Sequence, residues 1–237
     1  MFKIDKINYN KISEITENLL KDTNSITRHS ISLLNLVSPH PAHIDKYFIN
    51  KNILSRIYSF LSFFFLPLLN LSKKFYFSSN KIDKSISNIF ISHLIDNNYA
   101  GKDEDFYFGK IQNYLHKKDQ KSCLLLINHT KSNPTKLIKK WNNLQITRIF
   151  FTKYLSIFEE IVIRFLLYKE KIKIKKTIRN KIVTNFERYL FNQILADTFS
   201  PATIQNFRFY LQLNKLLNKL HIRNIFFTFE GHSYEKM

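Results

Sequence analysis

Short apolar runs alternate with longer stretches of helical spacing in the second half of this chain. Four runs have the β-branched and aromatic character of buried strands: residues 88–94 (NIFISHL), 122–128 (SCLLLIN), 146–152 (ITRIFFT) and 224–230 (NIFFTFE). Strands that are apolar on both sides and separated by helices are typical of a parallel sheet with helices on both faces. We therefore expect residues 86–237 to form a Rossmann-like α/β domain.

The segments between these runs predict the intervening helices. Apolar residues recur at helical spacing from Phe106 to Leu115 and over residues 155–190. Asn133 followed by Pro134 predicts a helix start, because Asn caps the free amides of a first turn and Pro fits its first position. Ser200 and Pro201 predict another start of the same kind.

The first 85 residues have a weaker pattern, which we interpret as a helical N-terminal segment. A polar stretch from Phe77 to Ser85 predicts a linker at the end of this N-terminal segment. Residues 57–71 are mostly apolar and lie between Arg56 and two lysines, but they are fewer than the roughly 20 residues that span a bilayer. We expect a buried or partner-facing helix there, with a helix lying in the membrane interface as the main alternative.

Charge and cysteine content indicate which partners and which cellular compartment to expect. The formal net charge is +19, which favours anionic partners such as nucleic acid, a membrane surface or a phosphorylated substrate. An AT-rich coding bias toward Lys, Asn, Ile and Phe explains the same surplus equally well. One cysteine, Cys123, and no visible secretory signal lead us to expect a cytoplasmic protein.

The candidate chemistry lies where the predicted strands end. His93 falls at the end of the first strand, Asn128 and His129 at the end of the second, and Glu230-Gly231-His232 at the end of the fourth. Ligands of open α/β sheets bind beyond the carboxyl ends of the strands, so we expect these side chains to share one crevice. Histidine and a desolvated carboxylate are suited to proton transfer near neutral pH, which makes Glu230 and His232 the candidate catalytic pair.

Further residues accompany these strand ends. Gly231 would let a backbone approach a ligand closely, and Glu235 would orient His232 or bind sugar hydroxyls. The loop from Gly101 to Asp105 is a candidate substrate-binding loop. The alternative is that its carboxylates only favour the start of the next helix.

Several motifs are absent from the sequence. It contains no GxGxxG after the first strand, no P-loop, no zinc-ligand spacing and no Gly-x-Ser-x-Gly elbow. We expect no bound metal and no dinucleotide cofactor. The basic run 169–181 has no RNA- or DNA-binding motif beside it, so a solvated helix face is favoured and nucleic acid is an unlikely partner.

Four segments together resemble a family of bacterial surface-carbohydrate biosynthesis proteins of the capsule and O-antigen type. They are FISHLID, AGKDEDFYFGKIQNYL, LLLINHT and the terminal FTFEGHSYEK, spread over residues 86–237. Phe229 to Glu235 correspond to a YEGH-W-E-like motif, with Tyr234 where the family has Trp. Members of this family resemble GT-B glycosyltransferases, which have two Rossmann-like domains with the active site between them.

The resemblance implies a metal-independent glycosyltransferase of surface polysaccharide synthesis. Glu230 or His232 would deprotonate the acceptor hydroxyl, while His93, Asn128, His129, Gly101 and Asp105 would line the acceptor cleft. The co-substrates would be a nucleotide sugar and a glycan or lipid-linked glycan acceptor, at the cytoplasmic face of the inner membrane. Family members continue into a second domain, so the resemblance also implies a fragment, inactive alone, with a separately encoded C-terminal half.

Two other classes of function stay open on the sequence. A basic nucleic-acid-binding module would explain the +19 charge and the aromatic content of 15%. A non-catalytic protein at the membrane periphery would use residues 57–71 and a degenerate enzyme fold.

Overall fold

The computed structural model describes residues 75–118, 120–142, 144–180 and 201–228, together with residues 192, 195, 198 and 199. These residues fall into two compact units. One unit contains a five-stranded sheet and takes in residues 72–155 and 211–230, and the other includes residues 156–210. The predicted helical N-terminal segment and residues 57–71 lie outside the described residues.

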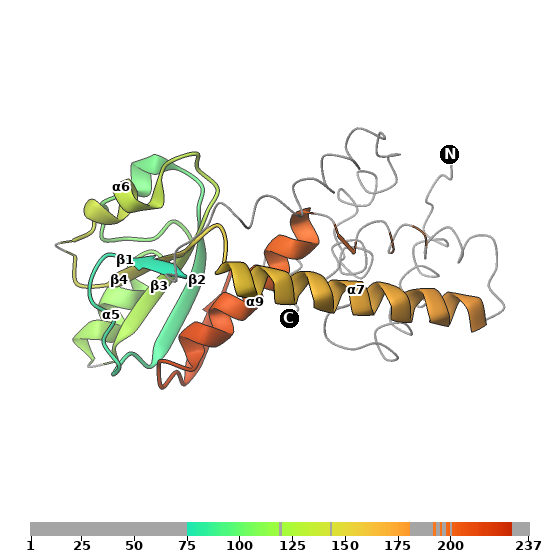
Figure 1. Cartoon of the computed structure of the whole chain (residues 1–237). Coiled ribbons are helices and arrows are strands. Elements are labelled where there is room, and N and C mark those ends of the chain that lie inside the picture. Colours follow the sequence, from blue (N-terminus) through green and yellow to red (C-terminus); the bar gives the residue numbers. More distant parts are fainter. Residues whose placement is uncertain are drawn as a thin grey trace, which may run out of the picture. The chain divides into compact units, whose positions relative to one another are not determined.

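The sheet confirms an α/β fold. Its strands are β1 (Tyr76–Ser78), β2 (Asn88–Leu94), β3 (Ser122–Asn128), β4 (Thr147–Phe151) and β5 (Asn224–Phe227), in the spatial order β1-β4-β3-β2-β5. The four predicted strands pair in parallel, and β1 joins them antiparallel to β4. The sheet is therefore mixed. Figure 1 shows it beside α5 (Ile111–Lys117) and α6 (Pro134–Lys139).

β5, predicted as a buried strand, is exposed at the edge of the sheet, but both faces of β2, β3 and β4 are buried. Alternate side chains of a strand point to opposite faces. On one face, Phe90 and Leu124 pack with Phe150 and with Trp141, which follows α6. The residues of the opposite face are equally buried, and they include Ile89, Ile91, Cys123, Leu125 and Ile149. This double burial explains why these strands are continuous apolar runs in the sequence.

β1 lies in the stretch from which the sequence predicted a linker. Tyr76 pairs with Phe151 and Ser78 with Ile149. The amide side chain of Gln212 also donates hydrogen bonds to the carbonyls of Phe75 and Thr152, at 3.3 and 2.9 Å. Three half-buried residues are too short a run to give a periodic signal, so the sheet begins before the predicted boundary at residue 85.

The predicted helix starts are mostly confirmed. Asn133 accepts a hydrogen bond from the Thr135 amide at 3.0 Å and caps α6, with Pro134 at the first position. The helix α7 (Ile157–Asn180) lies in the long helical region, and α9 (Pro201–Leu217) begins at the predicted proline. The exception is α5, which begins at Ile111 and not near Phe106 because residues 105–110 form a closed turn.

No helix in the described part of the chain has both the length and the apolarity needed to cross a bilayer.

Candidate functional site at the carboxyl ends of β2 and β3

The carboxyl ends of β2 and β3 bring two predicted site histidines into direct contact. In the parallel register, Leu94 lies opposite Asn128, and the His129 amide donates a hydrogen bond to the Leu94 carbonyl at 3.0 Å. The two imidazole rings are stacked, with centroids 4.9 Å apart. Nδ1 of His93 lies 2.6 Å from Nε2 of His129. The expected convergence of His93 and His129 is thus present in the structure.

This distance restricts the protonation of the pair. Two ring nitrogens at 2.6 Å form a hydrogen bond only if one carries a proton and the other is a bare acceptor. With both facing nitrogens protonated, the two N–H groups would point at each other and no hydrogen bond could form. One nitrogen therefore donates and the other accepts, and the tautomers of the two rings decide which.

Asn128 positions His129 through the loop that follows β3. Its amide oxygen accepts hydrogen bonds from the Thr130 amide at 3.0 Å and the Thr130 hydroxyl at 2.7 Å, and its NH2 donates to the Ser132 carbonyl at 2.9 Å. These three bonds close the loop immediately beyond the histidine. The role that they support for Asn128 is the orientation of His129.

Asp105 holds the neighbouring loop in place from a buried position. Its carboxylate accepts hydrogen bonds from the Ser92 hydroxyl at 2.8 Å and from the amides of Tyr107 and Phe108 at 3.0 and 2.9 Å. Its backbone exchanges two hydrogen bonds with Gly109, whose φ of 54° is in the left-handed region. Within this turn, Tyr107 lies edge-on to His93 at 6.0 Å, so Asp105 supports one wall of the histidine pair.

Gly101 and the residues after it are fixed by a buried arginine. Gly101 has a φ of 90°, a conformation that favours glycine. The Arg148 guanidinium is 1% exposed, donates to the Lys102 carbonyl at 3.2 Å and lies 3.9 Å from Asp103. Burial lowers the pKa of Arg148, and the nearby charges of Asp103 and Asp105 oppose that shift. The 101–105 loop is thus a built part of this edge of the sheet.

The remaining predicted residues lie outside the described part of the chain. They are Glu230, Gly231, His232 and Glu235, which follow β5. At the last described residue, the Thr228 amide donates to the Ile91 carbonyl at 3.3 Å and continues the pairing of β5 with β2.

Tyr107 and Arg148 contribute to this site, and the sequence did not indicate either of them. Tyr107 belongs to a predicted helix, and Arg148 interrupts a predicted strand. A lone arginine within a buried apolar run is a usable signal, because such a charge needs local partners.

Metal chemistry has no support in this region. The described residues contain no group of three or more His, Cys, Asp or Glu side chains placed to hold a metal ion.

Comparisons with known proteins do not extend this description: no family model, curated protein or solved structure matches the chain.

Proposed function

We propose that this chain binds a glycan acceptor at the carboxyl ends of β2 and β3 and belongs to a glycosyltransferase of bacterial surface polysaccharide synthesis. The observation that carries the proposal is the contact between the buried His93 and the exposed His129, at the edge of the sheet where α/β proteins bind ligands. A Rossmann-like, GT-B-like architecture is part of the same proposal.

The proposed reaction joins an acceptor hydroxyl to an activated sugar. The acceptor oxygen attacks the anomeric carbon of a nucleotide sugar, the bond from that carbon to the phosphate oxygen breaks, and the nucleoside diphosphate leaves. The hydroxyl proton passes to a base at the sheet edge. The histidine pair is proposed to accept it, because a neutral imidazole is a suitable base near neutral pH. Glu230 and His232 are the other proposed acid or base residues, with Gly231 and Glu235 beside them.

The other side chains of this edge have supporting roles in the proposal. Asn128 and Asp105 hold the two loops that flank the histidines, and the loop at Gly101 forms an outer wall for the acceptor. No metal is required, since the base and the leaving phosphate complete the reaction. The proposed location is the cytoplasmic face of the inner membrane, with a lipid-linked glycan as the acceptor.

The test separates binding from transfer. Oligosaccharides that bind the full chain on a glycan array are measured again in solution, with His129→Ala and with His221→Ala as the matched control, because His221 is exposed and lies before β5. We expect His129→Ala to weaken acceptor binding about tenfold, the effect of losing one hydrogen bond to a charged or strongly polar group. His221→Ala should have no effect.

Sugar transfer is then measured with radiolabelled UDP-sugars and with the oligosaccharide that the array identifies as the acceptor. Loss of transfer in His232→Ala and Glu230→Gln would support their catalytic roles, and unchanged transfer would remove them. If no oligosaccharide binds, or if His129→Ala and His221→Ala behave alike, the acceptor site is not at this edge.

A further inference from the structure

A cavity lies beside β1, and neither histidine of the pair lines it. It has a volume of about 630 Å³, within the range of small-molecule sites. Nine residues line it: Phe75, Tyr76, Phe77, Ser78, Thr135, Ile138, Lys139, Asn142 and Lys219. None of these residues belongs to the proposed acceptor site, so this cavity is argued independently of the proposed function.

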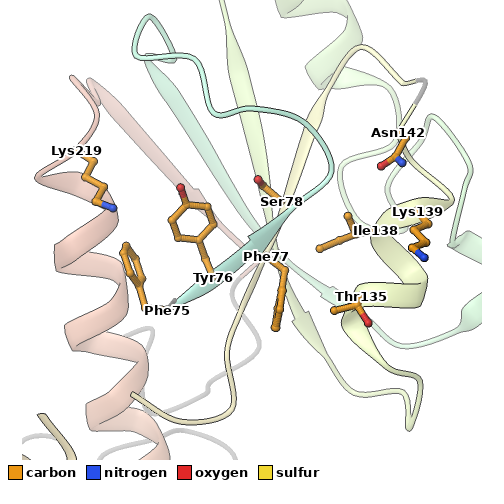
Figure 2. A pocket seen from close by; sticks show the side chains of 9 residues that line it. All are labelled: Phe75, Tyr76, Phe77, Ser78, Thr135, Ile138, Lys139, Asn142 and Lys219. Atoms are coloured by element: carbon orange, nitrogen blue, oxygen red, sulfur yellow. The ribbon is translucent and has the colours of Figure 1, made fainter. Parts of the chain in front are cut away.

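Aromatic rings form much of its wall. Figure 2 shows Phe75 and Tyr76 on the same side of β1 as Lys219, and Phe77 on the side of Ile138 and Thr135. Tyr76 and Phe77 are only half-buried, so they remain accessible to a ligand. Rings of this kind bind planar or apolar groups, and their faces also hold cations.

Lysine side chains supply the charge of the cavity. Lys219 lies over the rings of Phe75 and Tyr76, with Nζ 4.7 and 5.6 Å from the two centroids. Lys215 lies over Phe75 at 5.3 Å, and its pKa is lowered by burial and then by the charge of Lys219. Lys139 lines the cavity from α6. The residues that line it include no aspartate or glutamate.

Aromatic rings beside lysine side chains favour a ligand that has both an anionic group and an apolar part. Like charges four residues apart repel each other, and an anion placed beside them would relieve that repulsion. A phosphate group carries between one and two negative charges at neutral pH and accepts several hydrogen bonds, which suits two ammonium groups. Inorganic phosphate would leave most of an aromatic-walled cavity of about 630 Å³ unfilled.

We propose that the cavity between β1, α6 and Lys219 binds a ligand in which a phosphate or diphosphate is joined to an aromatic or other apolar body. Lys215 and Lys219, which both lie over Phe75, bind the phosphate oxygens, and Tyr76 and Phe77 contact the body. Two sources share this chemistry: a nucleoside diphosphate and an isoprenoid diphosphate.

The experiment titrates the full chain at low salt with UDP, geranyl diphosphate and inorganic pyrophosphate, by isothermal titration calorimetry. We expect UDP or geranyl diphosphate to bind at least tenfold more tightly than pyrophosphate. Lys215→Ala and Lys219→Ala should each weaken that binding roughly five- to tenfold, the effect of a partly exposed charged hydrogen bond. Lys136→Ala is the control, because Lys136 is exposed on α6 and does not line the cavity.

Tyr76→Leu separates the two sources, since it removes a ring face and keeps an apolar side chain. Weaker binding of UDP in this variant identifies a planar base as the body, whereas tight binding of geranyl diphosphate that survives the change identifies an isoprenoid. The inference is overturned if neither compound binds, if pyrophosphate binds as tightly as both, or if Lys136→Ala and Lys219→Ala lose affinity equally. Circular dichroism of each variant checks that the fold is retained.

Discussion

Asp105 shows how one buried side chain supports a whole wall of the candidate site. Its carboxylate is bound by one hydroxyl and two backbone amides, and it is 6% exposed. A carboxylate in this position needs no ligand to satisfy it. The sequence predicted Asp105 as a site residue from its place in a polar loop, and its contacts give it a supporting role beside Tyr107 and His93.

Asp105→Ala is expected to lower the free energy of unfolding by roughly 2–4 kcal/mol, because it leaves the Ser92 hydroxyl and two amides without their acceptor. Chemical denaturation measures this value. Ser92→Ala removes one donor and leaves the two amide bonds in place, so it should cost less. Equal losses in the two variants would show that the loop amides do not depend on Asp105.

Cys123 is fully buried on β3, and burial raises the pKa of its thiol to about 12. The folded state then holds the thiol proton at a pH where the unfolded chain, with a pKa near 9, has lost it. The resulting stability is fully present below about pH 9 and is lost as pH rises from 9 toward 12.

We expect the thiol to resist a disulfide reagent in the native protein at pH 8 and to react at once after unfolding. Between pH 9 and 11, Cys123→Ala should lose less stability with each unit of pH than the unchanged chain, by up to about 1.4 kcal/mol per unit. Rapid labelling of the native protein would show that this strand opens locally.

At the scale of elements, α6 depends on its cap. This helix has six residues, too few to be stable alone, and Asn133 accepts bonds from both the amide and the hydroxyl of Thr135. Leu137 and Ile138 attach it to the sheet core.

Asn133→Ala should lower the free energy of unfolding by about 1 kcal/mol, the usual cost of losing an N-cap, while Asn133→Asp should preserve it. Thermal unfolding followed by circular dichroism measures both variants. A neutral Asn133→Ala would mean that core packing alone holds α6.

A buried cluster of ionic side chains joins α7 to α9. Glu160 is 0% exposed and accepts bonds from Arg208 at 2.6 and 2.8 Å and from Arg164 at 2.8 Å. Burial lowers the pKa of Arg164, and Glu160 opposes that shift. Two guanidinium groups thus share one carboxylate away from water.

Glu160→Gln should destabilise the protein by roughly 3–5 kcal/mol, because it removes the charge of a buried carboxylate that two guanidinium groups bind. Glu159→Gln, one residue earlier in the same helix, is the control. The half-buried Glu159 carboxylate accepts hydrogen bonds from the amide and the hydroxyl of Ser156 at the helix start, so a much smaller loss is expected. Urea denaturation would contradict this account if the two variants matched.

The elements were predictable where the periodic signal was long. Four strands and the starts of α6 and α9 follow from apolar runs and from Asn or Pro at defined positions, although β5 is exposed where its apolar run predicted burial. β1 was missed because three half-buried residues give no period, and α5 was extended too far because Asp105 and Gly109 close a turn that apolar spacing does not reveal. The contact between His93 and His129 was predictable as a convergence, but its hydrogen bond depends on register and ring orientation, which a sequence does not specify.

At the scale of the whole molecule, the net charge of +19 acts on every anionic partner. It will attract nucleic acid and phosphate-bearing compounds without regard to sequence. Any assay of specific binding therefore needs a salt series.

We expect single-stranded oligonucleotides of different sequence to bind with similar affinity at 50 mM salt and to lose at least about a thousandfold by 200 mM, the behaviour of pure charge attraction. Fluorescence anisotropy measures this dependence. Tight binding that persists at 200 mM and distinguishes sequences would favour a nucleic-acid-binding function over glycosyl transfer.

The order of strands in the sheet also has a consequence for synthesis on the ribosome. β5 pairs with β2, and the side chain of Asn224 reaches Asn88 across 136 positions of sequence. β2 is therefore translated long before β5. Its apolar edge stays unpaired on that side while the ribosome adds more than a hundred residues. Such long-range pairing slows folding and leaves an aggregation-prone strand edge exposed during translation. Expression at lower temperature, or with chaperones that shield nascent chains, should therefore raise the yield of folded protein.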